Sequence, residues 1–352
     1  MKDIIILIPT LNPDQRLINL VHELKNIGIC QILIVNDGSL PTNRHIFTKL
    51  EKLNCTILHH RTNLGKGQSI KTGINYLLKN IQNTIGIVTA DDDGQHTPLD
   101  IQNIAAKLQN SDQIILGERE FDNKKMPLTS KIGNTFSSIY FWLTTRQKLK
   151  DTQTGLRGIP QKYFSFALDV PGHRYEYEMR FLEAMYEQNI PYQTVTIQTV
   201  YDKNWSTHFQ FISDSYNIYP KFFRNVLSSL SSAILDILFF MILVNFTNII
   251  LISNIIARLL SGIYNFILNK TWTFEKKDSH NTTTELKRYL ILFIVQMFVS
   301  SITTNWLNAT FQASTFGLLI IKIIVDLFIF TTNFIIQRQW VFHQKSTYKK
   351  SI

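Results

Sequence analysis

Three consecutive aspartates, Asp91, Asp92 and Asp93, follow a short apolar run whose composition is typical of a β-strand. Adjacent carboxylates repel one another, and a divalent cation is the natural partner that neutralises them. In an extended segment the side chains at positions i and i+2 point to the same side, so Asp91 and Asp93 can address one ion. The pattern predicts a Mg²⁺ or Mn²⁺ site at these two residues, with diphosphate oxygens as further ligands.

A solvated acidic loop is the competing interpretation of the triplet, and the elements around it favour the metal. Strand-like runs alternate with helical stretches near residues 15–27, 42–53 and 67–79, which predicts a largely parallel sheet. Ligands bind at the carboxyl ends of the strands in such sheets. The conspicuous polar motifs stand at those ends, in the order IPTLN, VNDGS, RTNLGKGQS and TADDDGQH.

The glycine-rich segment GKGQS invites a comparison with nucleotide-binding loops. It lacks the GxxxxGK[ST] spacing of a phosphate loop, and no GxGxxG follows the first strand. A P-loop kinase and a dinucleotide-dependent dehydrogenase are therefore poor interpretations. The two cysteines, Cys30 and Cys55, fit no metal or disulfide spacing and point weakly to a reducing compartment.

The net charge of +10 on 352 residues would ordinarily suggest a nucleic-acid partner. Residues 1–220 hold 23 Lys and Arg against 21 Asp and Glu, whereas residues 221–352 hold 13 against 5. The excess is thus +2 in the first part and +8 in the last third, which is also the apolar part. This distribution favours a membrane over nucleic acid as the partner.

Four apolar runs in the last third have the length of membrane-spanning helices, at residues 226–246, 249–268, 289–307 and 316–336. Lys and Arg flank the runs on one side only, and the two turns near Asn248 and Gln312 carry none. This positive-inside pattern predicts a multi-pass protein of the plasma membrane, with the first 220 residues and both termini in the cytoplasm. Four buried helices of a soluble domain are the disfavoured alternative.

The membrane third contains an internal repeat: NFILNKTWTF at 265–274 and NFIIQRQWVF at 333–342 share five of ten residues. The repeat predicts two hairpins of the same orientation, each ending in a Trp and a cation at the interface. Ionisable groups at membrane depth need partners, and we expect Arg258 to pair with Asp326 or Asp236. Lys322 is a candidate contact for a lipid phosphate, although purely structural pairing of the whole charge cluster is an equal alternative.

The ordered motifs IPTLNP, VNDGS, NLGKGQSIKTG, DDDGQH, GER, DTQTGLRG and RYEYE carry a family resemblance. They resemble the family 2 glycosyltransferases of the polyprenyl-phosphate sugar synthase (dolichol-phosphate mannose synthase-like) group, and the last third resembles a GtrA-like domain. The resemblance implies an α/β GT-A domain (Rossmann-like) at 1–214, an interfacial amphipathic helix at 215–225, and an all-α four-helix transmembrane domain at 226–342. A basic cytoplasmic tail would occupy 343–352.

The resemblance also implies residue roles. The predicted donor-binding residues are Pro9, Asn12, Asp37, Lys66, Asp91 and Gln95. The predicted catalytic residues are Asp93, Arg119, Asp151 and Arg157. Of the two predicted metal ligands, Asp93 is the one expected to contact the metal directly. Arg119 and Arg157 suit the gripping of phosphate, because guanidinium donates two parallel hydrogen bonds. Glu176 of RYEYE would face the sugar or Arg157, or else serve as an ordinary carboxylate at a helix start.

The implied reaction is inverting transfer of one sugar from a nucleotide sugar to polyprenyl (undecaprenyl) phosphate, for glycosylation of cell-envelope polysaccharide. Pro13 stands where mannose synthases commonly have Glu, which argues against GDP-mannose as the donor, and UDP-glucose is the donor that we expect. Asn36 replaces the first Asp of VDDGS and leaves the role of that position open.

Mannose or another hexose is the alternative sugar, and a flippase of lipid-linked sugar loaded by the soluble domain is the alternative function. A processive synthase would need a QxxRW motif, which we do not find, and the oligomeric state, with a homo-oligomer as one option, stays open.

Overall fold

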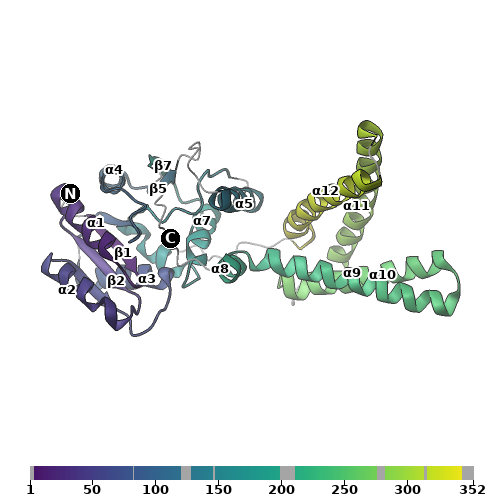
Figure 1. The fold of residues 1–352 in the computed structure, drawn as a ribbon, viewed down its shortest axis with the longest axis horizontal. Coiled ribbons are helices and arrows are strands. Elements are labelled where there is room, and N and C mark those ends of the chain that lie inside the picture. Colours follow the sequence, from purple (N-terminus) through teal and green to yellow (C-terminus); the bar gives the residue numbers. More distant parts are fainter. Residues whose placement is uncertain are drawn as a thin grey trace. The chain divides into compact units, whose positions relative to one another are not determined.

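The computed structural model describes residues 4–81, 83–119, 128–145, 147–198, 211–275, 282–312 and 315–342. The chain divides into two compact units, one ending at Ile218 and the other spanning Tyr219–Thr347 (Figure 1). Each unit is described by itself below. The predicted basic tail at 343–352 lies outside the described residues.

A seven-stranded sheet forms the centre of the first unit, in the order β3-β2-β1-β4-β6-β5-β7. β6 is antiparallel to both β4 and β5, and the other neighbours are parallel, as the alternation of strands and helices predicted. The strands are β1 (Ile4–Thr10), β2 (Ile32–Asn36), β3 (Thr56–His59), β4 (Gly86–Thr89), β5 (Ile114–Arg119), β6 (Arg157–Pro160) and β7 (Tyr192–Ile197).

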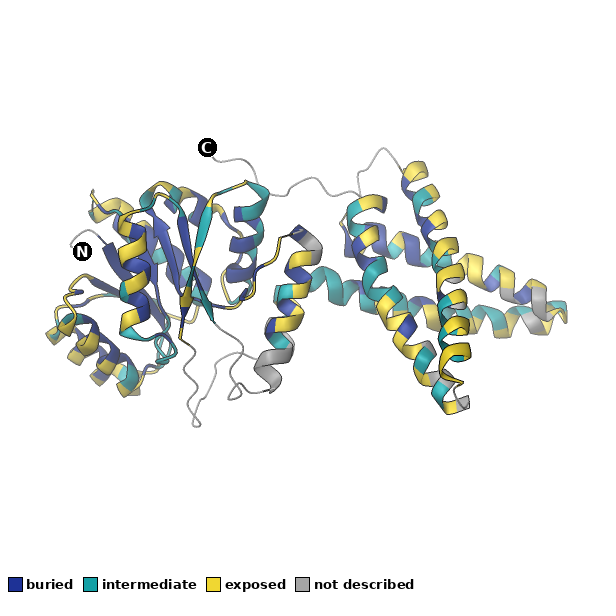
Figure 2. Cartoon of the chain, turned by 90° about the horizontal axis from the view of Figure 1, so that it is seen from above, coloured by how far each residue is buried: buried dark blue, intermediate teal, exposed yellow. Residues whose placement is uncertain are grey.

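Helices cover both faces of the sheet, and the alternation of side chains along β1 explains why. Ile4, Ile6 and Ile8 are buried with residues of α1 (Gln15–Asn26), α2 (Arg44–Lys52) and α4 (Pro98–Gln109) in one core. Leu7 points the other way, so close to α3 that a Cβ on Gly73 would lie 2.4 Å from it. The remaining helical elements of this unit are α3 (Lys66–Asn80), α5 (Leu128–Thr145), α6 (Phe164–Asp169), α7 (Glu176–Glu187), α8 (Phe211–Ile218) and the short turns η1 (Pro41–Asn43) and η2 (Gln161–Tyr163). Figure 2 shows the buried strands between more exposed helices.

The order of the strands determines where a ligand can bind. β1 lies between β2 and β4, so the helices that follow these strands depart from a common edge. Polar groups at the carboxyl ends of neighbouring parallel strands face one crevice at this switch point. The polar motifs that follow β1, β2 and β4 therefore lie at this edge of the sheet.

The second unit consists of two helical hairpins, and a helix covers each of the four predicted spans. They are α9 (Pro220–Thr247), α10 (Ile250–Leu268), α11 (Thr282–Phe311) and α12 (Thr315–Ile336), and α10 and α12 end in the π-helical turns η3 (Asn269–Thr273) and η4 (Gln337–Val341). Among the described residues, α9 and α11 meet the length and composition of a membrane span, with mean hydropathies of 2.2 and 1.7. Only 6% of each span is buried, which leaves an apolar surface for lipid.

The segment predicted as a separate interfacial helix, 215–225, is not one element in the structure. Its first residues end α8 at Ile218, and its last residues begin α9 at Pro220. Proline lacks the N–H that a continuing helix needs but suits the first helical position, so the chain breaks before Pro220 and starts a new helix with it. Residues 220–225 therefore belong to the first long apolar helix.

The membrane charges have partners within their hairpins. The Arg258 Nε atom lies 3.3 Å from Asp236 Oδ2, and Ser261 Oγ donates to Asp236 Oδ1 at 3.0 Å. Asp326 instead accepts a hydrogen bond from Ser300 Oγ at 2.8 Å. Of the two partners expected for Arg258, Asp236 is the one that it contacts. The side chain of Lys322 lies outside the described part.

Candidate active site

The acidic triplet follows β4 as a tight turn, and neighbouring groups fix its backbone. The backbone N–H of Asp91 donates to His96 Nδ1 at 3.1 Å, and Arg16 Nη1 donates to the carbonyl of Asp93 at 3.2 Å. Gly94 completes the turn with φ 81°, in the left-handed region that glycine adopts readily. The turn therefore replaces the extended segment on which the shared orientation of Asp91 and Asp93 was predicted.

The three carboxylates point to different partners. Asp91 Oδ1 lies 2.6 Å from Lys66 Nζ, and Asp92 accepts a hydrogen bond from Thr10 Oγ1 at the end of β1. Asp93 accepts from the backbone N–H of Gln95 at 3.1 Å and also from its side-chain amide. The structure thus brings the predicted residues Asp91 with Lys66 and Asp93 with Gln95 into direct contact.

The electrostatics of the turn differ from residue to residue. Burial, together with the charges of Asp93 and Asp91, raises the pKa of Asp92 to about 7. Burial also acts to raise the pKa of Asp91, but the Lys66 ammonium and other nearby cations outweigh it and lower this pKa to about 2. Asp91 is therefore ionised at neutral pH, whereas Asp92 keeps its proton up to about pH 7.

Lys66 is the main cation that faces the turn, and it contacts a second carboxylate. Its Nζ lies 2.6 Å from Glu178 Oε1 on α7 as well as 2.6 Å from Asp91. Burial acts against the charge of Lys66, yet the two carboxylates raise its pKa above the ordinary value, so it stays protonated. One ammonium thus connects the start of α3, the end of β4 and α7.

Two glycines allow Lys66 to reach this position. Gly65 has φ 101°, and a Cβ there would lie 2.4 Å from the carbonyl oxygen of His173. A Cβ on Gly155 would lie 2.7 Å from Lys66 Nζ and 2.8 Å from Asp91 Oδ1. The DTQTGLRG loop therefore lies directly against the Lys66–Asp91 pair, and only glycine fits at position 155 without displacing it.

Arg119 and Asp151, both predicted catalytic residues, form a two-pronged ion pair. Arg119 Nε donates to Asp151 Oδ2 at 2.6 Å and Arg119 Nη2 donates to Oδ1 at 3.0 Å. Asp151 is fully buried, whereas 15% of the Arg119 side chain remains exposed. The carboxylate fixes the plane of the guanidinium, and such a fixed guanidinium suits the recognition of a phosphate.

Arg157 differs from the prediction that it grips a phosphate. It is only 4% exposed, its Nη1 donates to the backbone carbonyl of Glu178 at 3.1 Å, and its Nε donates to Thr154 at 3.3 Å. The guanidinium also lies over the ring of Phe181 at 5.2 Å from its centroid. Its Nη2 lies 4.0 Å from Oε2 of Glu178, whose Oε1 contacts Lys66, so Arg157 joins β6 to the helix that carries this partner of Lys66.

Two of the residues predicted to bind the donor, Asn12 and Asp37, accept hydrogen bonds from other loops. Pro9 is buried in β1, and Asn12, with φ 52°, accepts a hydrogen bond from the Leu40 backbone N–H at 2.8 Å. Asp37 accepts from the N–H groups of Leu64 and Gly65, at 2.9 and 2.8 Å. Its carboxylate therefore positions the loop that carries Lys66.

Three site residues were missed by the sequence prediction: Thr10, His96 and above all Glu178. Glu176, the carboxylate singled out in RYEYE, instead accepts hydrogen bonds from the backbone of His173 and Arg174 at 3.0 and 3.2 Å. It is the helix-start carboxylate of the alternative interpretation. The signal for Glu178 was its position in the apolar stripe of α7, three and four residues before buried Phe181 and Leu182.

A divalent cation fits the donor chemistry of the acidic turn in part. The carboxylate oxygens of the three aspartates are hard ligands, which Mg²⁺ and Mn²⁺ prefer. No group of three or more His, Cys, Asp or Glu side chains in the described ranges is arranged to hold a metal ion. A cation here would therefore need further oxygens from a diphosphate and water, which is how Mg²⁺ is commonly bound.

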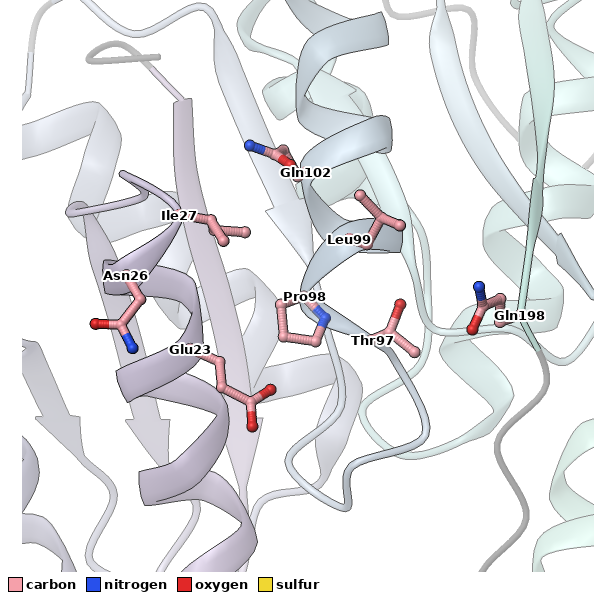
Figure 3. A pocket seen from close by; sticks show the side chains of 8 residues that line it. All are labelled: Glu23, Asn26, Ile27, Thr97, Pro98, Leu99, Gln102 and Gln198. Atoms are coloured by element: carbon pink, nitrogen blue, oxygen red, sulfur yellow. The ribbon is translucent and has the colours of Figure 1, made fainter.

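A separate cavity of about 380 Å³ lies where the end of α1 faces the start of α4 (Figure 3). Its lining residues are Glu23, Asn26, Ile27, Thr97, Pro98, Leu99, Gln102 and Gln198. None of the predicted site residues lines it. We therefore assign the candidate active site to the strand ends and not to this cavity.

Comparison with known families divides the chain as the two units do. Residues 5–168 match the model described as Glycosyl transferase family 2, and residues 225–348 match the model described as GtrA/DPMS, transmembrane domain. A Methanococcus voltae protein named UDP-N-acetylglucosamine–dolichyl-phosphate N-acetylglucosaminyltransferase is 30% identical over 222 residues, which cover 57% of this chain and 86% of that protein. An uncharacterised Methanocaldococcus jannaschii protein is 28% identical over 204 residues, covering 56% of this chain and 82% of that protein.

Two solved structures illustrate the similarity to known folds. Glucosyl-3-phosphoglycerate synthase from Mycobacterium tuberculosis, in complex with Mn²⁺, UDP and phosphoglyceric acid, gives a TM-score of 0.47 at 12% identity, covering 64% of this chain and 77% of that chain. Mannosyl-3-phosphoglycerate synthase from Rubrobacter xylanophilus gives 0.43 at 11% identity, covering 61% and 69%.

Proposed function

The chain belongs to the family 2 glycosyltransferases and carries a GtrA/DPMS transmembrane domain, and we propose that it transfers one sugar from a nucleotide donor to polyprenyl phosphate. The fold class predicted from the sequence, an α/β GT-A unit followed by an all-α membrane unit, is confirmed. The observation that carries the proposal is the pairing of Lys66 with Asp91 and Glu178 at the strand ends, beside the Arg119–Asp151 pair. One cation then faces the donor diphosphate and the other faces the acceptor phosphate.

On the donor side, Lys66 would bind the diphosphate that leaves the sugar. Asp91 and Asp93, the predicted metal ligands, would hold Mg²⁺ or Mn²⁺, which when bound would neutralise charge on that diphosphate. Lys66 keeps a carboxylate partner in Glu178 when Asp91 turns to another ligand, so the ammonium stays in place. Asp37 and Asn12 fix loops that would surround the nucleoside, Pro9 lies in the strand before them, and Gln95 orients Asp93.

On the acceptor side, Arg119 would bind the phosphate of the polyprenyl lipid. Asp151 holds the guanidinium through two hydrogen bonds, which limits its motion before the lipid arrives. The role is electrostatic, because two anions must approach each other in this site. Arg157 supports it indirectly, by holding the helix that carries Glu178.

The chemistry needs little help from a general base. A phosphate monoester is mostly ionised at neutral pH, so its oxygen can attack the anomeric carbon directly. The new bond joins that oxygen to the anomeric carbon, while the bond from this carbon to the diphosphate breaks and the diphosphate takes the electron pair. A single displacement inverts the configuration, which gives a β-linked lipid from an α-linked donor.

Two donors are supported by different observations. UDP-glucose is the donor that we expect, and Pro13, in place of the Glu common in mannose synthases, argues against GDP-mannose. UDP-N-acetylglucosamine is the second candidate, because the Methanococcus voltae relative is named for that substrate. The same acceptor chemistry and the same residues serve either sugar.

The GtrA/DPMS domain makes the chain a membrane protein. The one-sided distribution of Lys and Arg supports a cytoplasmic catalytic unit at the plasma membrane, where nucleotide sugars are available. A product for cell-envelope glycosylation follows from this location. We include both the orientation and the membrane in the proposal.

Membranes containing the protein test the proposal when they are incubated with undecaprenyl phosphate and labelled donors, one at a time. The donors are UDP-glucose, UDP-N-acetylglucosamine, UDP-galactose and GDP-mannose, each with and without Mn²⁺. We expect one UDP-sugar to label an acid-labile lipid in a metal-dependent manner. Absence of labelled lipid with every donor would refute the proposed function, and labelling by GDP-mannose alone would refute the donor assignment.

A further inference from the structure

The two hairpins of the membrane unit are equivalent in their contacts as well as in sequence. Asn269 Nδ2 donates to Gln337 Oε1 at 3.0 Å, and these two residues occupy matching positions 68 apart. The rings of Phe274 and Phe342, which also match, stack at 4.9 Å. Contacts between matching residues are expected where two copies meet around an approximate two-fold axis.

Several further contacts occur twice, once on each side of this axis. Phe266 stacks on Phe342 at 5.8 Å and Phe334 stacks on Phe274 at 5.9 Å. Arg224 Nη1 donates to the carbonyl of Trp272 at 3.1 Å, as Arg288 Nη1 does to Trp340 at 2.8 Å. The matching contacts of Arg224 and Arg288 set the register of α9 against α11. Each position in α9 matches the position 64 residues later in α11.

One of the two crossings between hairpins is closed by internal pairs. Where the start of α11 meets η3, Lys270 Nζ lies 3.0 Å from Glu285 Oε2, and both side chains are buried. Beside them the Tyr289 hydroxyl donates to Asn265 Oδ1 at 2.8 Å, and its ring packs against Phe266 at 5.4 Å. At this crossing the two charges are paired, and the Tyr289 ring fills the space beside them.

The approximate two-fold symmetry places the matching crossing at the start of α9 and η4, and the residue types there differ. The register places Lys221 at the position of Glu285, Arg338 at that of Lys270, and Asn225 at that of Tyr289. A cation therefore replaces the anion, and a short amide replaces the phenol. Asn225 is fully buried, and neither its Nδ2 nor its Oδ1 has a hydrogen-bond partner within the described structure.

We propose that this second crossing, defined by Lys221, Asn225 and Arg338, binds a phosphate group carried by a membrane lipid. A buried amide without a partner is costly, and a phosphate oxygen would accept the hydrogen bond that Asn225 Nδ2 can donate. Lysine and arginine at a membrane interface attract lipid phosphates. Phe222 lines the same crossing and packs against Phe330 and Phe334 at 6.2 and 5.7 Å, which offers an apolar wall to a lipid chain.

The symmetry supplies the test, because the first crossing shows a pairing that substitutions can introduce at the second. The double variant Lys221→Glu/Asn225→Tyr makes the second crossing a copy of the first, which the fold already accommodates. Lys287→Glu is the matched control, since it makes the same charge change at an exposed position of α11. Arg338→Gln removes one cation with a smaller change in shape and serves if the double variant does not fold.

Binding is measured by native mass spectrometry of the full chain released from phosphatidylcholine nanodiscs that contain undecaprenyl phosphate, phosphatidylglycerol or added inorganic phosphate. Wild type and Lys287→Glu should retain one of the lipids, and the double variant and Arg338→Gln should retain about tenfold less of it. Retention of undecaprenyl phosphate assigns the site to the acceptor, and retention of phosphatidylglycerol assigns it to the bulk lipid. Equal retention by wild type and a folded variant, or binding of inorganic phosphate alone, would overturn the proposal. No donor sugar is present, so this result is independent of whether the proposed transfer occurs.

Discussion

The charged groups at the site of the catalytic unit and those midway along the membrane helices are paired in different ways. In the catalytic unit, Lys66 contacts two carboxylates that come from distant segments, Asp91 after β4 and Glu178 on α7. In the membrane unit, the Asp236–Arg258 pair stays within one hairpin, and the matching positions of the other hairpin hold the Ser300–Asp326 hydrogen bond. The first arrangement gathers charges from distant segments at one edge of the sheet. The second joins the two helices of one hairpin, whereas the Lys270–Glu285 pair near the helix ends joins the two hairpins.

This difference predicts whether a substitution in each unit affects activity or stability. The acidic turn holds carboxylates whose pKa values are displaced in opposite directions, that of Asp91 downward and that of Asp92 upward, so its residues are expected to matter for activity more than for folding. A membrane pair has no water to replace a lost partner, so its residues are expected to matter for stability. The predictions below test this contrast, starting with the largest effect.

Asp93→Ala should have the largest effect on transfer, a loss of about a thousandfold, because the turn would lose the more direct of its two predicted metal ligands. The initial rate of lipid labelling in membranes measures it. Asp112→Ala removes a carboxylate that is 93% exposed and should leave the rate unchanged. A normal rate for Asp93→Ala would show that the turn does not serve the reaction.

Glu178→Gln should reduce kcat/KM by about ten- to a hundredfold, since Lys66 would lose one of its two carboxylate partners within the buried site. Glu176→Gln is the matched control two residues earlier in the same helix. Its side chain accepts backbone hydrogen bonds, which an amide oxygen can also accept, and its rate should stay near that of wild type. If Glu176→Gln had the larger effect, the assignment of the two carboxylates would be reversed.

Gly155→Ala should reduce kcat/KM by about tenfold with little loss of stability, because the added methyl group would displace the flexible end of Lys66 from Asp91. Gly133→Ala offers the comparison, since the nearest atom to its Cβ would lie 3.8 Å away. Steady-state kinetics and a thermal unfolding curve for each variant separate the two effects. Equal activity of the two variants would contradict the close approach at position 155.

Asp236→Asn should have the smallest effect on transfer and a measurable one on stability. It removes the anion that faces Arg258, and we expect the unfolding free energy in detergent to fall by about 1 kcal/mol. Asp326→Asn should cost less, because an amide oxygen can still accept the bond from Ser300. A larger loss for Asp326→Asn than for Asp236→Asn would contradict the pairing seen in the first hairpin.

The sequence predicted the elements well and the side-chain contacts less well, for reasons that particular residues show. The helix expected near 67–79 is Lys66–Asn80, because its hydrophobic period and its glycine start are local signals. The antiparallel β6 was not foreseen, and it buries Arg157 against α7, with its Nη2 4.0 Å from Glu178 Oε2. Such an orientation depends on which strands become neighbours, which no local pattern specifies.

Residues 176 and 178 illustrate the same limit at finer scale. The motif RYEYE offers two carboxylates, and the choice between them depends on where α7 begins. Starting at Glu176, the helix gives Glu176 to the first turn and Glu178 to the buried stripe. Helix boundaries are less certain from sequence than helix existence, and here two residues decide which carboxylate reaches Lys66.

The most direct test of the central claim is the mass of the lipid made by the purified full chain from undecaprenyl phosphate and a single UDP-sugar with Mn²⁺. The proposed function predicts a lipid heavier by one hexose with UDP-glucose, or by one N-acetylhexosamine with UDP-N-acetylglucosamine, and no such product from Asp93→Ala. Unmodified lipid with both donors, under conditions where the protein is folded, would contradict it.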